Sequence, residues 1–133
     1  LVSNKSLHKV INDINPDIIN IHWVGNSFMP ISLLKKFKQP IIWSLYDMWP
    51  FTGGCHYDNF CNRFKSQCGS CPQLKSSNYD LSRFLVLKKE KEWRHKNITV
   101  VSPSYWLNNL AKEMNLGKFD WEEFKSYRDE GKK

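Results

Sequence analysis

The sequence predicts an α/β domain in which a parallel sheet is flanked by helices. Patterns typical of helices and of strands alternate along the chain, as they do in βαβ units. The three strand patterns are apolar almost throughout, as expected for parallel strands that are buried on both faces. The 133 residues are 41% hydrophobic and 25% charged, which is ordinary for a folded domain. We therefore expect one Rossmann-like domain over residues 1–116 and a charged tail over 117–133.

The first part of the chain contains two helical and two strand patterns. Apolar residues recur at helical spacing over 6–14, until an Asn-Pro pair interrupts the pattern. Residues 17–24 are apolar and largely β-branched, which predicts a strand. A short helix is predicted over 28–37, with its apolar side chains turned inward, and a second strand over 41–45.

The later elements follow a long loop. A helix is predicted over 79–95, with many lysines on its outside and a set of apolar residues: Leu81, Phe84, Leu85, Leu87 and Trp93. A third strand is predicted over 98–101. Ser102 or Ser104 then caps a helix over 105–115, which a glycine at 117 ends. The tail that follows has only a modest apolar stripe, so it is either an amphipathic helix docked on the domain or a frayed end.

The chain carries a formal net charge of +7, with 20 Lys and Arg residues against 13 Asp and Glu. This excess favours anionic partners, such as phosphate groups, a membrane surface or nucleic acid, but a solvated basic surface explains it equally well. No apolar run approaches the ~20 residues of a membrane span, and no secretory signal is visible. We therefore expect a cytoplasmic protein, either free or in peripheral contact with the inner face of the membrane.

All four cysteines lie in the loop predicted over 47–78: Cys55, Cys61, Cys68 and Cys71. Connections of this length are uncommon unless they have a function or are held by a bond or an ion. The two residues between Cys68 and Cys71 let both thiolates converge on one tetrahedral ion, and His56 could replace a thiolate or contact one. We expect a structural zinc ion that orders the loop. Two disulfides or an iron–sulfur cluster are the alternatives.

Polar residues follow each predicted strand, at the edge where open parallel sheets bind ligands. The catalytic candidates are Asp47, which could orient or deprotonate a hydroxyl, His22, which could donate to one, and Tyr46 beside them. The substrate-binding candidates are nearby aromatic, small and hydroxyl residues: Trp23, Trp49, Thr52, Gly53, Gly54, Ser102 and Ser104. Each has a structural alternative, because an Asp often closes a turn, a Ser caps a helix and a Trp packs a loop.

These residues carry a resemblance to a known family. The chain resembles the N-terminal domain of a family-4 glycosyltransferase of the kind found in polysaccharide and colanic-acid-type biosynthesis. The resemblance covers roughly residues 5 to 115 and is strongest in five segments: DIINIHW at 17–23, PIIWSL at 40–45, DMWPFTGGCHY at 47–57, CGSCPQL at 68–74 and VVSPSYWL at 100–107.

The resemblance implies a partial GT-B enzyme that transfers a sugar from a nucleotide donor to the hydroxyl of a glycan or lipid-linked acceptor, usually with retention and without an essential metal. This domain would hold the acceptor, and a missing C-terminal domain would bind the nucleotide sugar. We therefore expect the chain to be inactive alone. Tyr46 departs from the family, in which many members have a His that is thought to contact the transferred sugar.

An alternative function belongs to a different class. The chain could be a small zinc-stabilised module whose basic helix binds a phosphorylated or nucleic-acid partner. The residues that would make this contact are Lys88, Lys89, Lys91, Arg94 and Lys96. These residues are equally explained as the solvent-facing side of an amphipathic helix, so nucleic acid is the less favoured partner.

Overall fold

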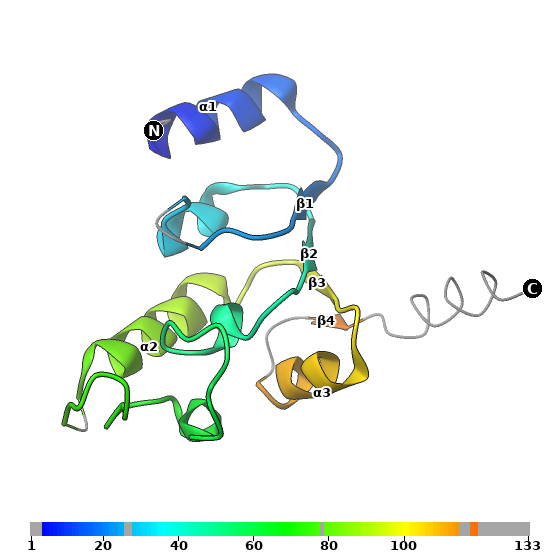
Figure 1. The fold of residues 1–133 in the computed structure, drawn as a ribbon. Coiled ribbons are helices and arrows are strands. Elements are labelled where there is room, and N and C mark those ends of the chain that lie inside the picture. The colour runs from blue at the N-terminus through cyan, green and yellow to red at the C-terminus, as the bar shows by residue number, and fades with distance from the viewer. Residues whose placement is uncertain (1–3, 26–27, 78, 115–117, 120–133) are drawn as a thin grey trace, which may run out of the picture.

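A parallel sheet forms the centre of the fold (Figure 1). Its strands lie in the order β1 (Ile19–Ile21), β2 (Ile41–Ser44), β3 (Ile98–Val101) and β4 (Lys118–Phe119). The structure is a computed structural model that describes residues 4–25, 28–77, 79–114 and 118–119. Every adjacent pair of these strands is parallel, which confirms the predicted sheet. The strand β4 was not predicted, and the rest of the tail and the glycine at 117 lie outside the described residues.

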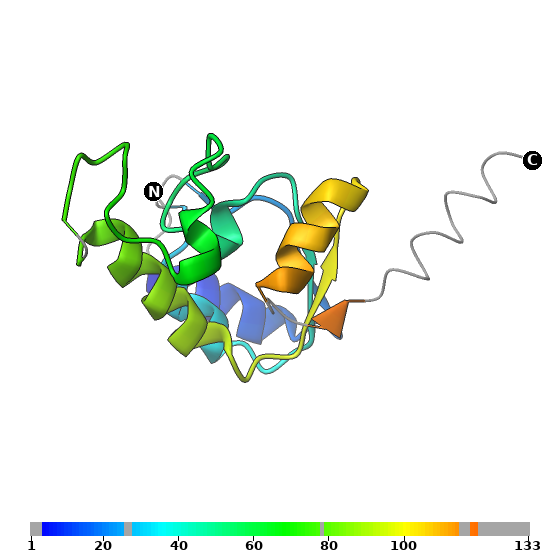
Figure 2. The ribbon, with the colours of Figure 1, turned by 90° about the horizontal axis from the view of Figure 1, so that it is seen from below.

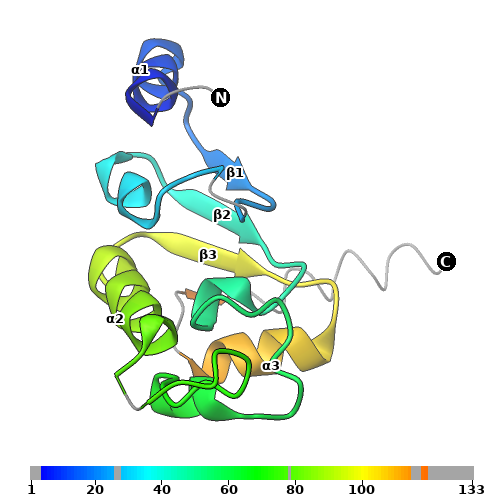
Figure 3. The ribbon, with the colours of Figure 1, turned by 60° about the vertical axis from the view of Figure 1, so that its left-hand side comes forward.

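The register of the sheet brings the strand ends to one edge. Ile21 of β1 pairs with Trp43 of β2, which pairs with Val100 of β3. Figure 3 shows that the arrowheads of β1, β2 and β3 point the same way, so the residues that follow them leave the sheet at the same edge. The strand predicted over 17–24 is shorter in the structure, because pairing with β2 covers only Ile19 to Ile21.

The helices are α1 (Asn4–Ile14), the 3-10 helix η1 (Ile31–Lys36), α2 (Leu81–Trp93) and α3 (Tyr105–Glu113). In Figure 1 α1, η1 and α2 lie on the same side of the sheet. The short helix predicted after the first strand is present, although as a 3-10 helix, and its apolar residues are buried or partly buried as expected. Ser104 caps α3 by accepting a hydrogen bond from the Leu107 amide at 3.2 Å. None of the described helices is long and apolar enough to cross a membrane.

The buried side of α2 differs from the prediction. The residues that it buries are Ser82, Val86, Lys89 and Trp93, whereas Leu81, Phe84 and Leu87 are exposed. The reason is that α2 packs against polar loop backbone as well as against the core. Ser82 is small enough to lie against Gly53, and the Lys89 ammonium reaches carbonyl groups of the loop. Trp93 packs in the core, edge-on to Trp43 at 5.1 Å between ring centroids.

The loop between β2 and α2 is irregular but tightly bonded. It contains two short 3-10 helices, η2 (Trp49–Phe51) and η3 (Arg63–Ser66). The views in Figures 1 and 2 place it against α2. Asp80, the N-cap of α2, accepts hydrogen bonds from the Cys71 amide at 2.8 Å and from the hydroxyls of Ser76 and Ser82. These bonds hold the pKa of the Asp80 carboxyl well below its ordinary value, the Ser76 hydroxyl contributing most.

Candidate functional site

The ends of β1 and β2 place four of the predicted site residues side by side. His22 and Trp23 follow β1, and Tyr46 and Asp47 follow β2. Leu45 lies between β2 and Tyr46, and its amide donates to the Val101 carbonyl at 2.8 Å. This bond continues the pairing of β2 with β3 up to Tyr46. The polar side chains that follow the two strands therefore meet at one edge of the sheet, as the order of the predicted strands indicates.

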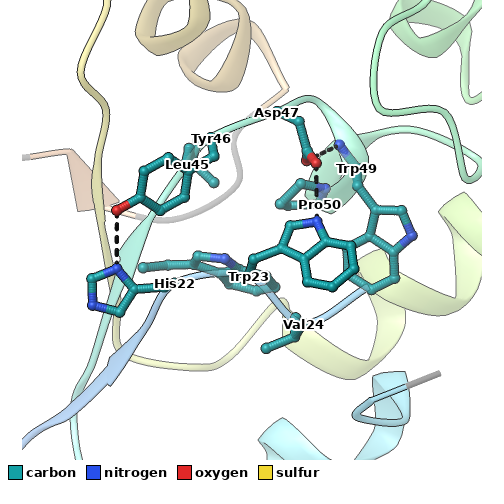
Figure 4. A pocket seen from close by; sticks show the side chains of 9 residues that line it. His22, Trp23, Val24, Leu45, Tyr46, Asp47, Trp49 and Pro50 are labelled. Carbon is teal, nitrogen blue, oxygen red and sulfur yellow. Dashed lines mark hydrogen bonds between the residues drawn. The ribbon is translucent and has the colours of Figure 1, made fainter. Parts of the chain in front are cut away.

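Asp47 is the centre of this cluster and accepts hydrogen bonds from donors on three segments. Its Oδ1 accepts from the Trp49 amide at 2.9 Å, and its Oδ2 accepts from the Trp23 indole Nε1 at 3.3 Å (Figure 4). The same Oδ2 lies 2.5 Å from His56 Nδ1. Asp47 is buried and has little access to water, so these contacts supply the hydrogen-bond donors that its carboxylate needs. Asp47 thus fixes the rings of Trp23 and His56 in place.

The sequence did not predict the bond between His56 and Asp47. The position of His56 beside Cys55 predicts only a substitute for a thiolate or a contact to one. His56 lies in an irregular part of the loop, so sequence spacing does not indicate that it meets Trp23 on the same carboxylate. The indole of Trp23 also stacks on the imidazole of His56, with ring centroids 6.1 Å apart and planes 27° apart.

His22 and Tyr46 form a second pair at the same edge. The His22 Nδ1 and the Tyr46 hydroxyl lie 3.1 Å apart, and their rings are stacked with centroids separated by 6.0 Å. Both side chains are exposed. Figure 4 shows this pair beside Trp23 and Asp47. The pair offers two groups that can exchange hydrogen bonds with a ligand.

A small pocket lies between these pairs, lined mainly by residues that follow β1 and β2: His22, Trp23, Val24, Trp43, Leu45, Tyr46, Asp47, Trp49 and Pro50. Its free volume is about 10 Å³, which is room for about one water molecule. A ligand as large as a sugar ring would therefore lie over the exposed edges of these side chains and not inside the pocket.

Three predicted substrate-binding residues follow η2 and have structural contacts. The Thr52 hydroxyl donates to the Cys55 carbonyl at 2.6 Å, and the side chain is buried. A Cβ at Gly53 would lie 2.5 Å from backbone and side-chain atoms of Ser82, so this glycine allows the loop to approach α2. Gly54 is exposed, and its φ of 138° favours glycine.

The two serines after β3 also have structural contacts. Ser102 is buried, and its hydroxyl donates to the Ser104 carbonyl at 3.2 Å. Ser104 is the cap of α3 described above. The turn between β3 and α3 is therefore held by its own serines, and it reaches the same edge of the sheet as the Asp47 cluster.

Lys89 contradicts the basic binding face suggested for α2. It is 3% exposed, and its Nζ donates to the Trp49 carbonyl at 2.5 Å and to the Thr52 carbonyl at 3.0 Å. The ammonium also lies over the Trp49 ring, 3.7 Å from its centroid. Burial lowers the pKa of Lys89 to about 7. Lys96 is bonded as well, to the Phe37 carbonyl at 2.7 Å. Two of the proposed contact residues therefore bind the protein itself.

The four cysteines have free thiols. Burial raises the pKa of Cys55, with smaller contributions from Cys71 and Cys61, and burial likewise raises the pKa of Cys68. The thiols are thus near enough to affect one another electrostatically. Within the part of the chain that the structure describes, no group of three or more His, Cys, Asp or Glu side chains is arranged to hold a metal ion. Zinc binding therefore stays a prediction.

The fold and this cluster define a class: an α/β domain with an open parallel sheet and a polar, aromatic site at the carboxyl ends of its strands. No family model matches the chain, and no solved structure matches it. The chain is similar to a protein of Escherichia coli (strain K12) that is named as a colanic acid biosynthesis glycosyl transferase, WcaC. The two are 23% identical over 105 residues, which cover 68% of this chain and 25% of the relative. The chain thus spans about a quarter of that protein, and the similarity supports a relationship to glycosyltransferases.

Proposed function

We propose that this chain forms the acceptor side of a GT-B glycosyltransferase of the family-4 type, in which a sugar passes from a nucleotide donor to an acceptor hydroxyl during polysaccharide biosynthesis. The observation that carries the proposal is the cluster around Asp47, where residues from the ends of two parallel strands meet those of the loop. The similarity to a named glycosyl transferase supports the choice of substrate class.

In this proposal Asp47 is a positioning residue, because its oxygens already accept three hydrogen bonds from protein donors. The exposed side chains at the ends of β1 and β2, His22, Tyr46 and Trp23, are free to contact a sugar. Tyr46 provides a hydroxyl that can both donate to and accept from a sugar hydroxyl. The donor diphosphate would be bound and stabilised by a further domain, since leaving-group charge needs cationic or amide donors aimed at it.

The test compares binding with catalysis in the same chain. Saturation-transfer NMR is recorded with trisaccharides of glucose, galactose and mannose, and separately with UDP-glucose and GDP-mannose. We expect signals from the trisaccharides, weak or absent signals from the nucleotide sugars, and no transfer when all are incubated together. Strong binding of nucleotide sugars without binding of trisaccharides would contradict the assignment of the acceptor side. Transfer by the chain alone would contradict the need for a second domain.

A further inference from the structure

Two exposed aromatic rings stack on one another, and one of them directly follows His56 of the Asp47 cluster in the chain. Tyr57 belongs to the loop after β2, and Trp106 lies in the first turn of α3. Their ring centroids are 6.2 Å apart and their planes differ by 19°. Tyr57 is 55% exposed and Trp106 is 52% exposed, so each ring is held by the other while much of its surface faces solvent. Grouped exposed aromatic side chains commonly mark a binding site.

The chain connects this pair directly to the site described above. Tyr57 directly follows His56 in the chain, and the ring of His56 stacks on Trp23. Asp47 holds both His56 and Trp23 through hydrogen bonds from their ring nitrogens. One buried carboxylate therefore orders the rings of Trp23 and His56, and the residue after His56 begins the Tyr57 and Trp106 pair.

The surface combines the two kinds of contact that a sugar ring requires. A pyranose has apolar C–H faces, which can pack on the solvent-facing surface of the Trp106 and Tyr57 pair, and it has hydroxyls around its edge. His56 uses Nδ1 for Asp47, so its Nε2 lies on the opposite side of the imidazole. A sugar hydroxyl can donate to Nε2 or accept from it, and the contact forms in either protonation state of the ring.

The charges near this surface favour a neutral ligand. The residues that line the adjoining pocket include Asp47 and no Lys or Arg. Lys89, which bonds the same loop, is buried and directs its ammonium to the Trp49 and Thr52 carbonyls. Diphosphate recognition normally uses Arg, Lys or several backbone amides. A glycan therefore fits this surface better than the phosphate portion of a nucleotide sugar does.

We propose that Trp23, His56, Tyr57 and Trp106, here called the aromatic rim, form the subsite for a pyranose ring of the glycan acceptor. The inference rests on the proposed function and extends it. It assigns acceptor binding to His56, Tyr57 and Trp106, which are not among the substrate-binding residues predicted from the sequence. Trp106 and Tyr57 stack on the ring, His56 bonds one of its hydroxyls, and Trp23 closes the inner side.

The test is an NMR titration of the ¹⁵N-labelled 133-residue chain with the trisaccharide that gives the strongest saturation-transfer signal. Trp106→Ala and Tyr57→Ala should each weaken binding by about 3- to 10-fold, as loss of one aromatic stacking partner would predict. Trp106→Phe retains an aromatic face and should stay within about twofold of the unaltered chain. Tyr79→Ala is the matched control, because Tyr79 is also exposed and packs on Arg83 instead of the aromatic rim.

The outcomes separate this inference from the proposed function. If the trisaccharide binds and the two alanine variants lose no more affinity than Tyr79→Ala, the aromatic rim is not the subsite. If Trp106→Ala changes the sedimentation of the chain from dimer to monomer without changing glycan affinity, the aromatic rim is a contact between copies and the inference is wrong. If no trisaccharide binds the unaltered chain, the proposed function fails, and this inference fails with it.

Discussion

Replacing Lys89 with methionine would test how the loop after β2 is held against α2. The Lys89 ammonium is buried under that loop, where it bonds the carbonyls of Trp49 and Thr52 and lies over the Trp49 ring. Burial lowers its pKa from an ordinary value of 10.5 to about 7, while nearby Cys68 and Asp47 act in the opposite direction. Methionine has a similar length and does not ionise, so it removes the proton equilibrium while it fills much of the same space.

The lowered pKa of Lys89 determines whether the free energy of unfolding rises or falls with pH. Below about pH 7 the side chain is protonated in both the folded and the unfolded chain. As the pH rises above 7 the folded chain releases this proton, whereas the unfolded chain keeps it until about 10.5. The unfolded state then binds more protons, so the free energy of unfolding rises with pH, by at most about 1.4 kcal/mol per pH unit. Between pH 6 and 8.5 the expected gain is about 2 kcal/mol.

Urea unfolding at several pH values between 6 and 8.5 measures this gain. The free energy of unfolding of the unaltered chain, minus that of Lys89→Met, should increase by about 2 kcal/mol over this range. Lys88→Met is the matched control, because Lys88 is the neighbouring lysine on α2 and is exposed. It should show no comparable increase. A difference for Lys89→Met that stays flat with pH would refute the buried ammonium as the cause.

Three further predictions concern the turn after β3, the packing of the loop and its thiols. Ser104→Ala removes the N-cap of α3 and should lower the free energy of unfolding by about 1 kcal/mol in urea titrations; no change would mean that the cap is dispensable. Gly53→Ala should cost about 1–3 kcal/mol or more, because the added Cβ would meet Ser82 at 2.5 Å, and a variant as stable as the parent would contradict that packing. Elemental analysis of protein purified without added zinc should give about one zinc per chain, and a chelator should loosen the loop; metal-free protein without titratable thiols would indicate disulfides.

Much of the fold could be predicted because its signals are local. The β3 segment, Ile98–Val101, is β-branched and apolar, and the predicted bounds agree with the structure. The cap at Ser104 follows from a serine that directly precedes a helical pattern. The strand β4 could not be predicted, because its two residues, Lys118 and Phe119, have no periodicity and their pairing with β3 depends on tertiary structure.

The candidate site was predictable where it depends on strand order and unpredictable where it depends on the loop. Parallel strands bring their ends together, so the proximity of Trp23 and Asp47 follows from the sheet. The position of His56 depends on the path of an irregular loop, which composition does not determine. Lys89 was expected in solvent because lysine rarely lies in a core, and its burial is explained only by loop carbonyls that accept its hydrogen bonds.

The central claim is that the carboxyl edge of the sheet binds the acceptor sugar, and the indole N–H signals of the ¹⁵N-labelled chain test it most directly. Trp23 lies at that edge and is 46% exposed, whereas Trp93 is buried and donates to the Ile31 carbonyl at 2.8 Å. On addition of a trisaccharide, the Trp23 indole signal should shift in a saturable way and the Trp93 signal should stay in place. A saturable shift at Trp93, or binding that leaves Trp23 unchanged, would contradict the claim.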